Sequence, residues 1–144
     1  WVMNLRTGEV LHHEFVGHGY GSANTSNRSE SDRFGNESNS GRSSLGLMRA
    51  TGSNQVSSAA GRRGTPVQRF QGLERGFNDN VASRNVIMHQ AKNARGQYAD
   101  GRGVHANSAG CWVLEPKASD RVVATIPAGG RVWRRSGGRR LPCR

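Results

Sequence analysis

The chain has 144 residues, 33% of them hydrophobic, with 20 glycines and a net charge of +11. This length fits one domain, and the low apolar content favours a compact β structure over a helical bundle. No apolar run approaches the length of a membrane span, so we expect no transmembrane segment. Two cysteines are too few for a disulfide framework, which excludes the class of small disulfide-stapled proteins.

The positive charge is concentrated at the C-terminal end. Of 21 basic residues 19 are arginines, and six of these lie in residues 131–144, where no acidic residue occurs. Without that segment, 15 basic residues face 10 acidic ones. We therefore divide the chain into a domain of residues 1–130 and an Arg-rich tail of residues 131–144. Such charge favours a polyanionic environment, which is nucleic acid, anionic lipid or an anionic cell wall.

The N-terminal third predicts a hairpin and a long loop. Trp1–Leu5 and Val10–Val16 alternate as strands do, and a Gly-containing turn separates them. Residues 22–44 are rich in Ser, Asn, Gly and Arg, which predicts a polar loop. A loop of this length either lacks fixed structure or forms a flap over a site. Leu45–Thr51 then predicts a short strand, with Gly46 at a close backbone approach.

The middle of the chain predicts two more strands. Val67–Leu73 is the first, and Asn78–Arg84 follows as a turn or a single helical turn. Asn85–His89 is a compact apolar run that ends in histidine, as in a buried central strand. Residues 90–107 are again a glycine-rich loop.

The C-terminal part predicts a short helix among strands. Cys111–Leu114 is apolar, and Glu115–Asp120 begins a helix with Pro116 in its first turn. Val122–Ile126 and Gly130–Trp133 are predicted as the closing pair of strands. The whole pattern predicts a mostly β domain with long loops.

Five histidines and two cysteines are the reactive residues. His13 and His18, with Glu14 between them, approach the zinc-protease pattern His-Glu-x-x-His, in which two histidines one helical turn apart share a metal. Here the second histidine is one residue too late, and the segment is predicted as a strand. We therefore interpret His12 and His13 as an exposed pair and predict no metal site.

Cys111 follows Gly110 and comes after the strand that ends in His89. Cysteine catalysis needs a thiolate, an imidazole that holds the proton, and amide donors for the oxyanion. Gly110 permits a tight turn that leaves amides free, and a buried strand would hold His89 firmly. A small buried cysteine is the alternative, and spacing alone favours that alternative.

The strand ending in His89, the glycine-rich loop and Ser108-Ala109-Gly110-Cys111 together resemble the L,D-transpeptidase catalytic domain, the YkuD-like family. The resemblance extends in order over about residues 1–126. It includes the hairpin at Val2–Leu11, His18-Gly19, Ser43-Ser44-Leu45-Gly46, Leu73-Glu74, Gly76-Phe77-Asn78-Asp79-Asn80, Arg84 and Val86-Ile87-Met88-His89.

This resemblance implies roles for individual residues. Cys111 is the nucleophile and His89 its base, which the backbone carbonyl of Gln90 orients. Amides around Gly110 and Cys111 stabilise the oxyanion. Substrate-binding roles fall to four further residues, which are Ser108, His105, Ser44 and Asn78.

The resemblance also implies a fold and an activity. The fold is a mostly β sandwich or barrel with long loops and one or two short helices. The enzyme attacks the carbonyl of the third residue of a peptidoglycan stem peptide, releases D-alanine and forms a thioester. An amine of a neighbouring stem then makes a cross-link, or water makes the enzyme an L,D-carboxypeptidase. No cofactor is needed, and we expect a monomer in the cell envelope, periplasmic or secreted, whose signal peptide is not in this chain.

Several positions depart from the family pattern. Ala109 stands where many members have histidine, and Gln90 where they have glycine or serine; we hypothesise that His105 substitutes for the missing imidazole. Residues 131–144 do not resemble the closing strand of the family. A disulfide between Cys111 and Cys143 would block the nucleophile, but two free thiols are expected.

Two alternatives therefore stay open beside the enzyme. One is an inactive wall-binding module of the same fold, which the change at Ala109 would permit. The other is a basic nucleic-acid-binding protein with salt-dependent affinity. We expect no nucleic-acid partner, because the chain has no motif of that class and its few aromatic residues are not spaced as a stacking platform.

Overall fold

The structure is a computed structural model that describes residues 1–24, 26, 31–55, 64–91, 94 and 108–134. Within these ranges the chain is mostly β with one α-helix and long connecting loops, so the predicted fold class is confirmed. None of the helices in the described ranges is long and apolar enough to cross a membrane.

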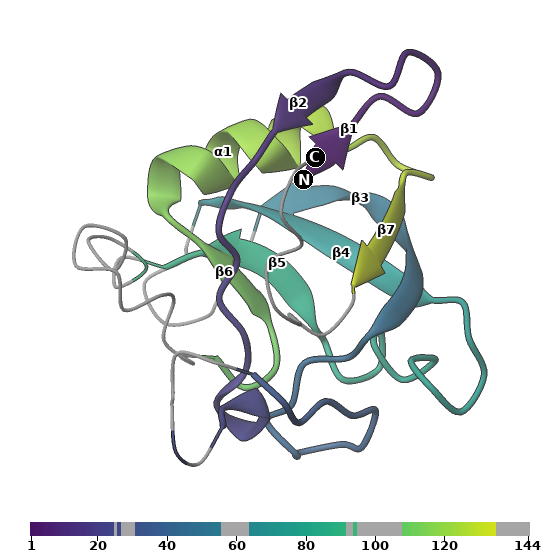
Figure 1. Ribbon diagram of the computed structural model, residues 1–144, viewed down its shortest axis with the longest axis vertical. Coiled ribbons are helices and arrows are strands. Elements are labelled where there is room, and N and C mark those ends of the chain that lie inside the picture. The colour runs from purple at the N-terminus through teal and green to yellow at the C-terminus, as the bar shows by residue number, and fades with distance from the viewer. Residues whose placement is uncertain (25, 27–30, 56–63, 92–93, 95–107, 135–144) are drawn as a thin grey trace.

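The centre of the fold is a curled sheet of five strands (Figure 1). Its strands are β3 (Gly46–Gln55), β4 (Pro66–Gly72), β5 (Ile87–Gln90), β6 (Trp112–Leu114) and β7 (Arg131–Arg134). They lie in the order β6-β5-β4-β3-β7. All neighbours run antiparallel except β5 and β6, which are parallel.

The predicted strands agree with the sheet in all but one place. The segments around Gly46, Val67, Ile87 and Val132 are strands as expected, and the apolar run Cys111–Leu114, for which no element was predicted, contains strand β6. The prediction of a strand at Val122–Ile126 is wrong, because most of these residues belong to helix α1 (Pro116–Thr125). A short apolar run with β-branched residues fits either element, and here burial follows the helical period, on Ala118, Ser119, Val122 and Val123.

Helix α1 has clear signals at both ends. The carboxylate of Glu115 accepts a hydrogen bond from the Ala118 amide at 3.1 Å, and Pro116 occupies the first turn, as predicted. Pro127 follows the last turn and cannot continue the helix. The cap and the two prolines therefore account for both ends of the helix.

The two faces of the sheet have different surroundings. Side chains alternate between faces along each strand, so Met48, Phe70, Met88, Trp112 and Leu114 share one face. All five are buried in one cluster together with the apolar residues of α1. The opposite face carries the remaining strand residues, and the helix leaves it uncovered. This second face holds the residues described below.

The N-terminal hairpin packs beside α1 rather than in the sheet (Figure 1). Its strands β1 (Val2–Met3) and β2 (Val10–His12) pair antiparallel, so the hairpin is confirmed, but the extension of the second strand to Val16 is wrong. Side chains tie this stretch to the helix instead: His12 Nε2 lies 2.7 Å from Thr125 Oγ1, and Arg121 pairs with Glu14 at 2.9 Å.

The long polar loop is held by side chains. It begins with the 3-10 turn η1 (Tyr20–Ser22), and its described residues between 31 and 45 form no strand longer than an isolated bridge.

At the other end of the chain, residues 131–134 of the predicted Arg-rich tail form β7 and pair with β3. Residues 135–144, including Cys143, lie outside the described ranges, so the tail itself stays a prediction.

Candidate active site

His89 is held at the end of β5 in one orientation. The side chain is 5% exposed, and its Nδ1 lies 2.6 Å from the main-chain oxygen of Gln90. A carbonyl oxygen can only accept, so Nδ1 carries the proton and Nε2 keeps a lone pair in the neutral ring. The contact with the Gln90 carbonyl is the one that the family resemblance implied for this ring.

Cys111 lies on the same face of the sheet as His89. In the parallel pair of β5 and β6, His89 is opposite Val113, and Cys111 precedes Val113 by two residues. Partners across strands and residues two apart share a face. Cys111 also packs on Ile87, which is two residues before His89. Tertiary structure thus brings together two residues that are 22 positions apart in the chain.

The thiol of Cys111 is free and half-buried. Its sulfur lies 3.7 Å from the main-chain oxygen of Asn85, which accepts a weak hydrogen bond from the S–H group. Asn85 has a φ of +53°, a left-handed conformation that a non-glycine residue adopts rarely. This conformation ends the turn before β5 and directs the carbonyl toward the sulfur.

The backbone before Cys111 has unused amide donors. In the described part of the chain, no hydrogen bond uses the amide N–H of Gly110 or of Cys111. Gly110 has a φ of +115°, and a Cβ there would lie 2.7 Å from the Arg42 carbonyl oxygen. Only glycine fits this position, and the turn that it permits leaves two amides next to the sulfur.

Two serine hydroxyls hold this turn from opposite sides. Ser108 Oγ donates to the Cys111 carbonyl oxygen at 2.6 Å. The fully buried Ser43 donates to the Gly110 carbonyl at 2.9 Å and accepts from the Gly19 amide at 2.9 Å. With both carbonyls of Gly110 and Cys111 occupied, the peptide planes are fixed and the amides keep their direction.

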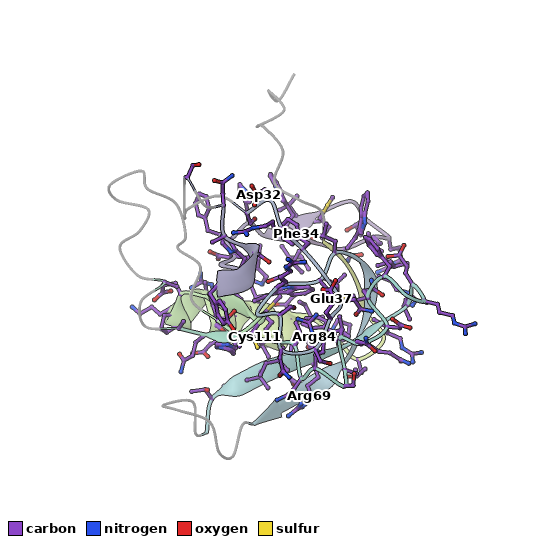
Figure 2. All side chains as sticks on the ribbon, turned by 90° about the horizontal axis from the view of Figure 1, so that it is seen from below. Asp32, Phe34, Glu37, Arg69, Arg84 and Cys111 are labelled. Atoms are coloured by element: carbon purple, nitrogen blue, oxygen red, sulfur yellow. The ribbon has the colours of Figure 1, made fainter. Side chains whose placement is uncertain are left out.

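Arg84 braces the loop that covers Gly110. Its guanidinium donates to the carbonyls of Gly35 at 2.9 Å and Arg42 at 2.6 Å, and to Ser44 Oγ at 2.9 Å. One of its nitrogens lies 3.3 Å from the position of a Cβ on Gly110. Figure 2 shows Arg84 beside Cys111, at the centre of this group.

The Arg84 guanidinium also interacts with the sulfur by charge. Burial lowers the pKa of Arg84, while the negative charges of Glu37 and of the Cys111 thiolate raise it. Arginine stays protonated in either case. A permanent positive charge therefore lies near the position where the thiolate forms.

The remaining predicted site residues lie in different places. Ser44 is buried and donates to Gly35, and the side chain of Asn78 is fully buried against the carbonyls of Leu45 and Leu47. These contacts are structural, and the roles of both residues in substrate binding stay predictions. His105 lies outside the described residues, and Ala109 is exposed.

The described residues contain no group of three or more metal-ligating side chains. The two histidines of the near-zinc pattern have other contacts. His13 stacks on Trp1 with ring centroids 3.8 Å apart, and the buried His18 places Nδ1 3.0 Å from the Gly19 carbonyl oxygen.

Sequence reasoning did not assign a role to Ser43, Arg84 or Asn85. Ser43 and Arg84 occurred only as matches to the family pattern, and Asn85 only as the first residue of an apolar run. The one available signal was a polar residue directly before a predicted buried strand, as Asn85 is. The site combines an imidazole and a thiol on one sheet face with main-chain amides beside the sulfur, and these are the kinds of group that acyl transfer uses.

Comparison with known proteins places the chain in a family. A family described as the L,D-transpeptidase catalytic domain matches residues 1–134. No curated protein and no solved structure matches the chain.

Proposed function

The chain belongs to the L,D-transpeptidase catalytic domain family, and on this basis we propose that it is a cysteine-dependent L,D-transpeptidase of peptidoglycan stem peptides. One observation supports the proposal most strongly. His89 is fixed by Gln90 with Nε2 unprotonated, and it shares a sheet face with the free thiol of Cys111.

The first half-reaction is acylation of Cys111. The thiol proton moves to His89 Nε2, and the thiolate attacks the carbonyl carbon of the third stem residue. The oxyanion that forms accepts hydrogen bonds from the amides of Gly110 and Cys111. When the tetrahedral intermediate collapses, the C–N bond breaks, and imidazolium gives its proton to the amine of the departing D-alanine.

The second half-reaction releases the acyl group. An amine of a second stem, or water, attacks the thioester while His89 takes one of its protons. The C–S bond breaks, and the thiolate regains a proton from His89. An amine acceptor gives a cross-link and water gives a shortened stem, so the same residues support transpeptidation and carboxypeptidation.

Intact mass spectrometry tests the proposal. The folded protein is incubated with a carbapenem or with a stem tetrapeptide, and we expect a covalent adduct on wild type and none on Cys111→Ala. A Cys143→Ser variant is the matched control, because it keeps Cys111 and removes the other thiol. Folded wild type without an adduct would contradict the proposal and favour an inactive wall-binding module.

His89→Gln tests the base separately. Glutamine can still bond to a carbonyl but cannot take a proton, so acylation should slow by about 10²–10⁴-fold. An unchanged rate would remove His89 from the mechanism. Since the substrate is wall material, we propose a periplasmic or extracellular location for the domain.

A further inference from the structure

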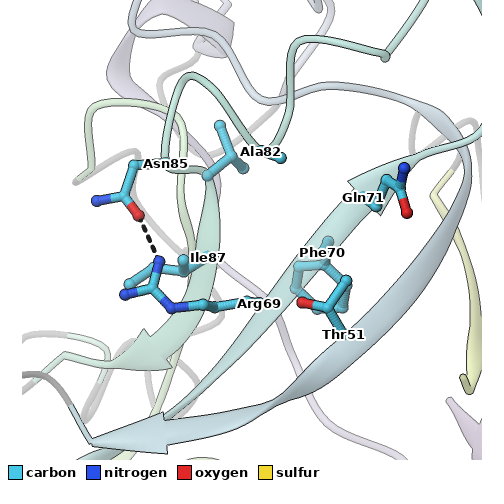
Figure 3. Close-up of a pocket in the computed structure, with 8 residues that line it drawn as sticks. Thr51, Arg69, Phe70, Gln71, Ala82, Asn85 and Ile87 are labelled. Carbon is cyan, nitrogen blue, oxygen red and sulfur yellow. Dashed lines mark hydrogen bonds between the residues drawn. The ribbon is translucent and has the colours of Figure 1, made fainter. Parts of the chain in front are cut away.

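A pocket lies on the open face of the sheet, next to Cys111. It has a volume of about 230 Å³ and opens between β3, β4 and the turn before β5 (Figure 3). Two of its lining residues touch the nucleophile, since the Asn85 carbonyl accepts from the sulfur and Ile87 packs on Cys111. The pocket therefore adjoins the site where the scissile carbonyl would lie.

Arg69 is the charged residue of this pocket. Its Nη1 donates to Asn85 Oδ1 at 2.8 Å, and within the described residues this is the only hydrogen bond of the guanidinium. No acidic side chain is among the described residues that line the pocket. Among the described residues that line the pocket, Arg69 thus carries the one formal charge, and a neutral amide holds it with further N–H donors available.

Asn85 forms hydrogen bonds with both Arg69 and Cys111. Its side chain accepts from Arg69 and its main chain accepts from Cys111. Arg69 is also opposite Ile87 in the sheet, and the register of β5 and β6 continued by one step brings Ile87 opposite Cys111. The backbones of Arg69 and Cys111 are thus about two strand spacings apart, or about 10 Å, on the same face.

This separation suits the residue that follows the scissile carbonyl. One extended residue spans about 3.5 Å, so a bound donor whose scissile carbonyl lies at Cys111, with its C–N bond still intact, can place its C-terminal carboxylate between the sulfur and Arg69. An arginine fork matches a carboxylate in shape and charge. The side chains of Ala82 and Ile87 line the pocket beside it and would contact a small apolar group such as a methyl.

We propose that the Arg69 pocket binds the free C-terminal carboxylate of the departing D-alanine, which makes it the leaving-residue subsite of this enzyme. The inference rests on the proposed function, since it places the donor by its attack at Cys111. It predicts that the enzyme distinguishes donors that end in a free acid from those that end in an amide or a further residue.

The test uses two synthetic stem tetrapeptides with lysine at the third position. They differ only at the C-terminus, which is D-alanine or D-alaninamide. Wild type should acylate with the acid about 10- to 100-fold faster than with the amide, the range for one charge-assisted interaction. Arg69→Gln should lose this preference by slowing the acid alone, and Arg69→Lys should keep part of it.

Arg131→Gln is the matched control. Arg131 lies on β7 opposite Arg49 of β3, so it shares the sheet face of Arg69, but it does not line the pocket. Its replacement removes the same charge from the same sheet face, so the acid-to-amide ratio should stay at the wild-type value. A ratio that falls equally in both variants would assign the preference to overall charge and overturn the subsite.

A binding measurement separates this inference from the proposed function. On Cys111→Ala, calorimetry should show tighter binding of the acid than of the amide, and Arg69→Gln in that background should abolish the difference. Equal binding of the two peptides, or a difference that survives Arg69→Gln, overturns the subsite. If the two peptides differ in affinity and the difference depends on Arg69, but wild type is not acylated, the proposed transpeptidase activity is overturned and the carboxylate site at Arg69 is not.

Discussion

Replacing Arg84 with methionine should destabilise the protein much more than a typical surface substitution. The side chain keeps an unbranched apolar stem but loses the guanidinium and its hydrogen bonds to Gly35, Arg42 and Ser44. Hydrogen bonds to a charged group contribute about 1.5–3 kcal/mol each. Arg84 is only half-buried and water can reach part of the loop, so we expect a total loss of about 2–4 kcal/mol.

The assay is urea unfolding at neutral pH, followed by circular dichroism. With a slope of about 2 kcal/mol per molar urea, the loss lowers the midpoint by about 1–2 M. Arg121→Met is the control, because Arg121 forms an exposed ion pair with Glu14, worth less than about 1 kcal/mol. A midpoint of Arg84→Met no lower than that of Arg121→Met would refute the bracing role.

Arg84→Lys separates charge from geometry. Lysine keeps the positive charge near Cys111 but has no planar fork to reach carbonyls of two different loop segments. We expect it to recover only part of the lost stability. Acylation measured per folded molecule should fall in Arg84→Met, since the Arg42 carbonyl that Arg84 holds lies against Gly110.

Three further predictions follow from single contacts. Gly110→Ala should abolish acylation even where the protein folds, because a Cβ would meet the Arg42 carbonyl at 2.7 Å and the φ is +115°; adduct mass measures this. Asn78→Ala should cost about 2–4 kcal/mol in urea unfolding, since it removes the hydrogen bonds of a fully buried side chain to the carbonyls of Leu45 and Leu47. Hydrogen bonds from the Gly76 amide and from Asn36 lower the pKa of Asp79. The Asp79 carboxylate therefore stabilises the folded state above about pH 4, and this stabilisation is lost as the pH falls through the lowered pKa. The stability gap between wild type and Asp79→Asn should therefore close on acidification, and a gap of constant size would contradict this.

The strands could be read from the chain because their signals are local, whereas the roles proposed for His89 and Cys111 came from the family resemblance. The apolar run before His89 marks a buried strand, and Gly110 before Cys111 marks a backbone turn. Pro116 after Glu115 marks the start of the helix, which the cap at Glu115 confirms. Each of these depends on residues within a few positions of one another, where spacing and propensity act directly.

Errors arose where local pattern was ambiguous. The Val122–Ile126 run suits a strand by its β-branched residues, but the apolar spacing that begins at Ala118 continues a helical face onto the core. The predicted second strand of the hairpin continued to Val16, yet the chain leaves β2 after His12. There His12 and Glu14 meet side chains of α1 that are more than a hundred residues away.

By itself, the sequence determined which residues could react and which elements carry them, since a nucleophile, an imidazole and a glycine turn are properties of short segments. The tertiary structure decided what surrounds those residues. Ser43 reaches Gly110 across 67 positions, and Arg84 reaches Arg42 across 42. Arg69 comes beside Cys111 only because β4, β5 and β6 pair in one register. Contacts of this kind leave no trace in local spacing, because they depend on how distant strands and loops pack together.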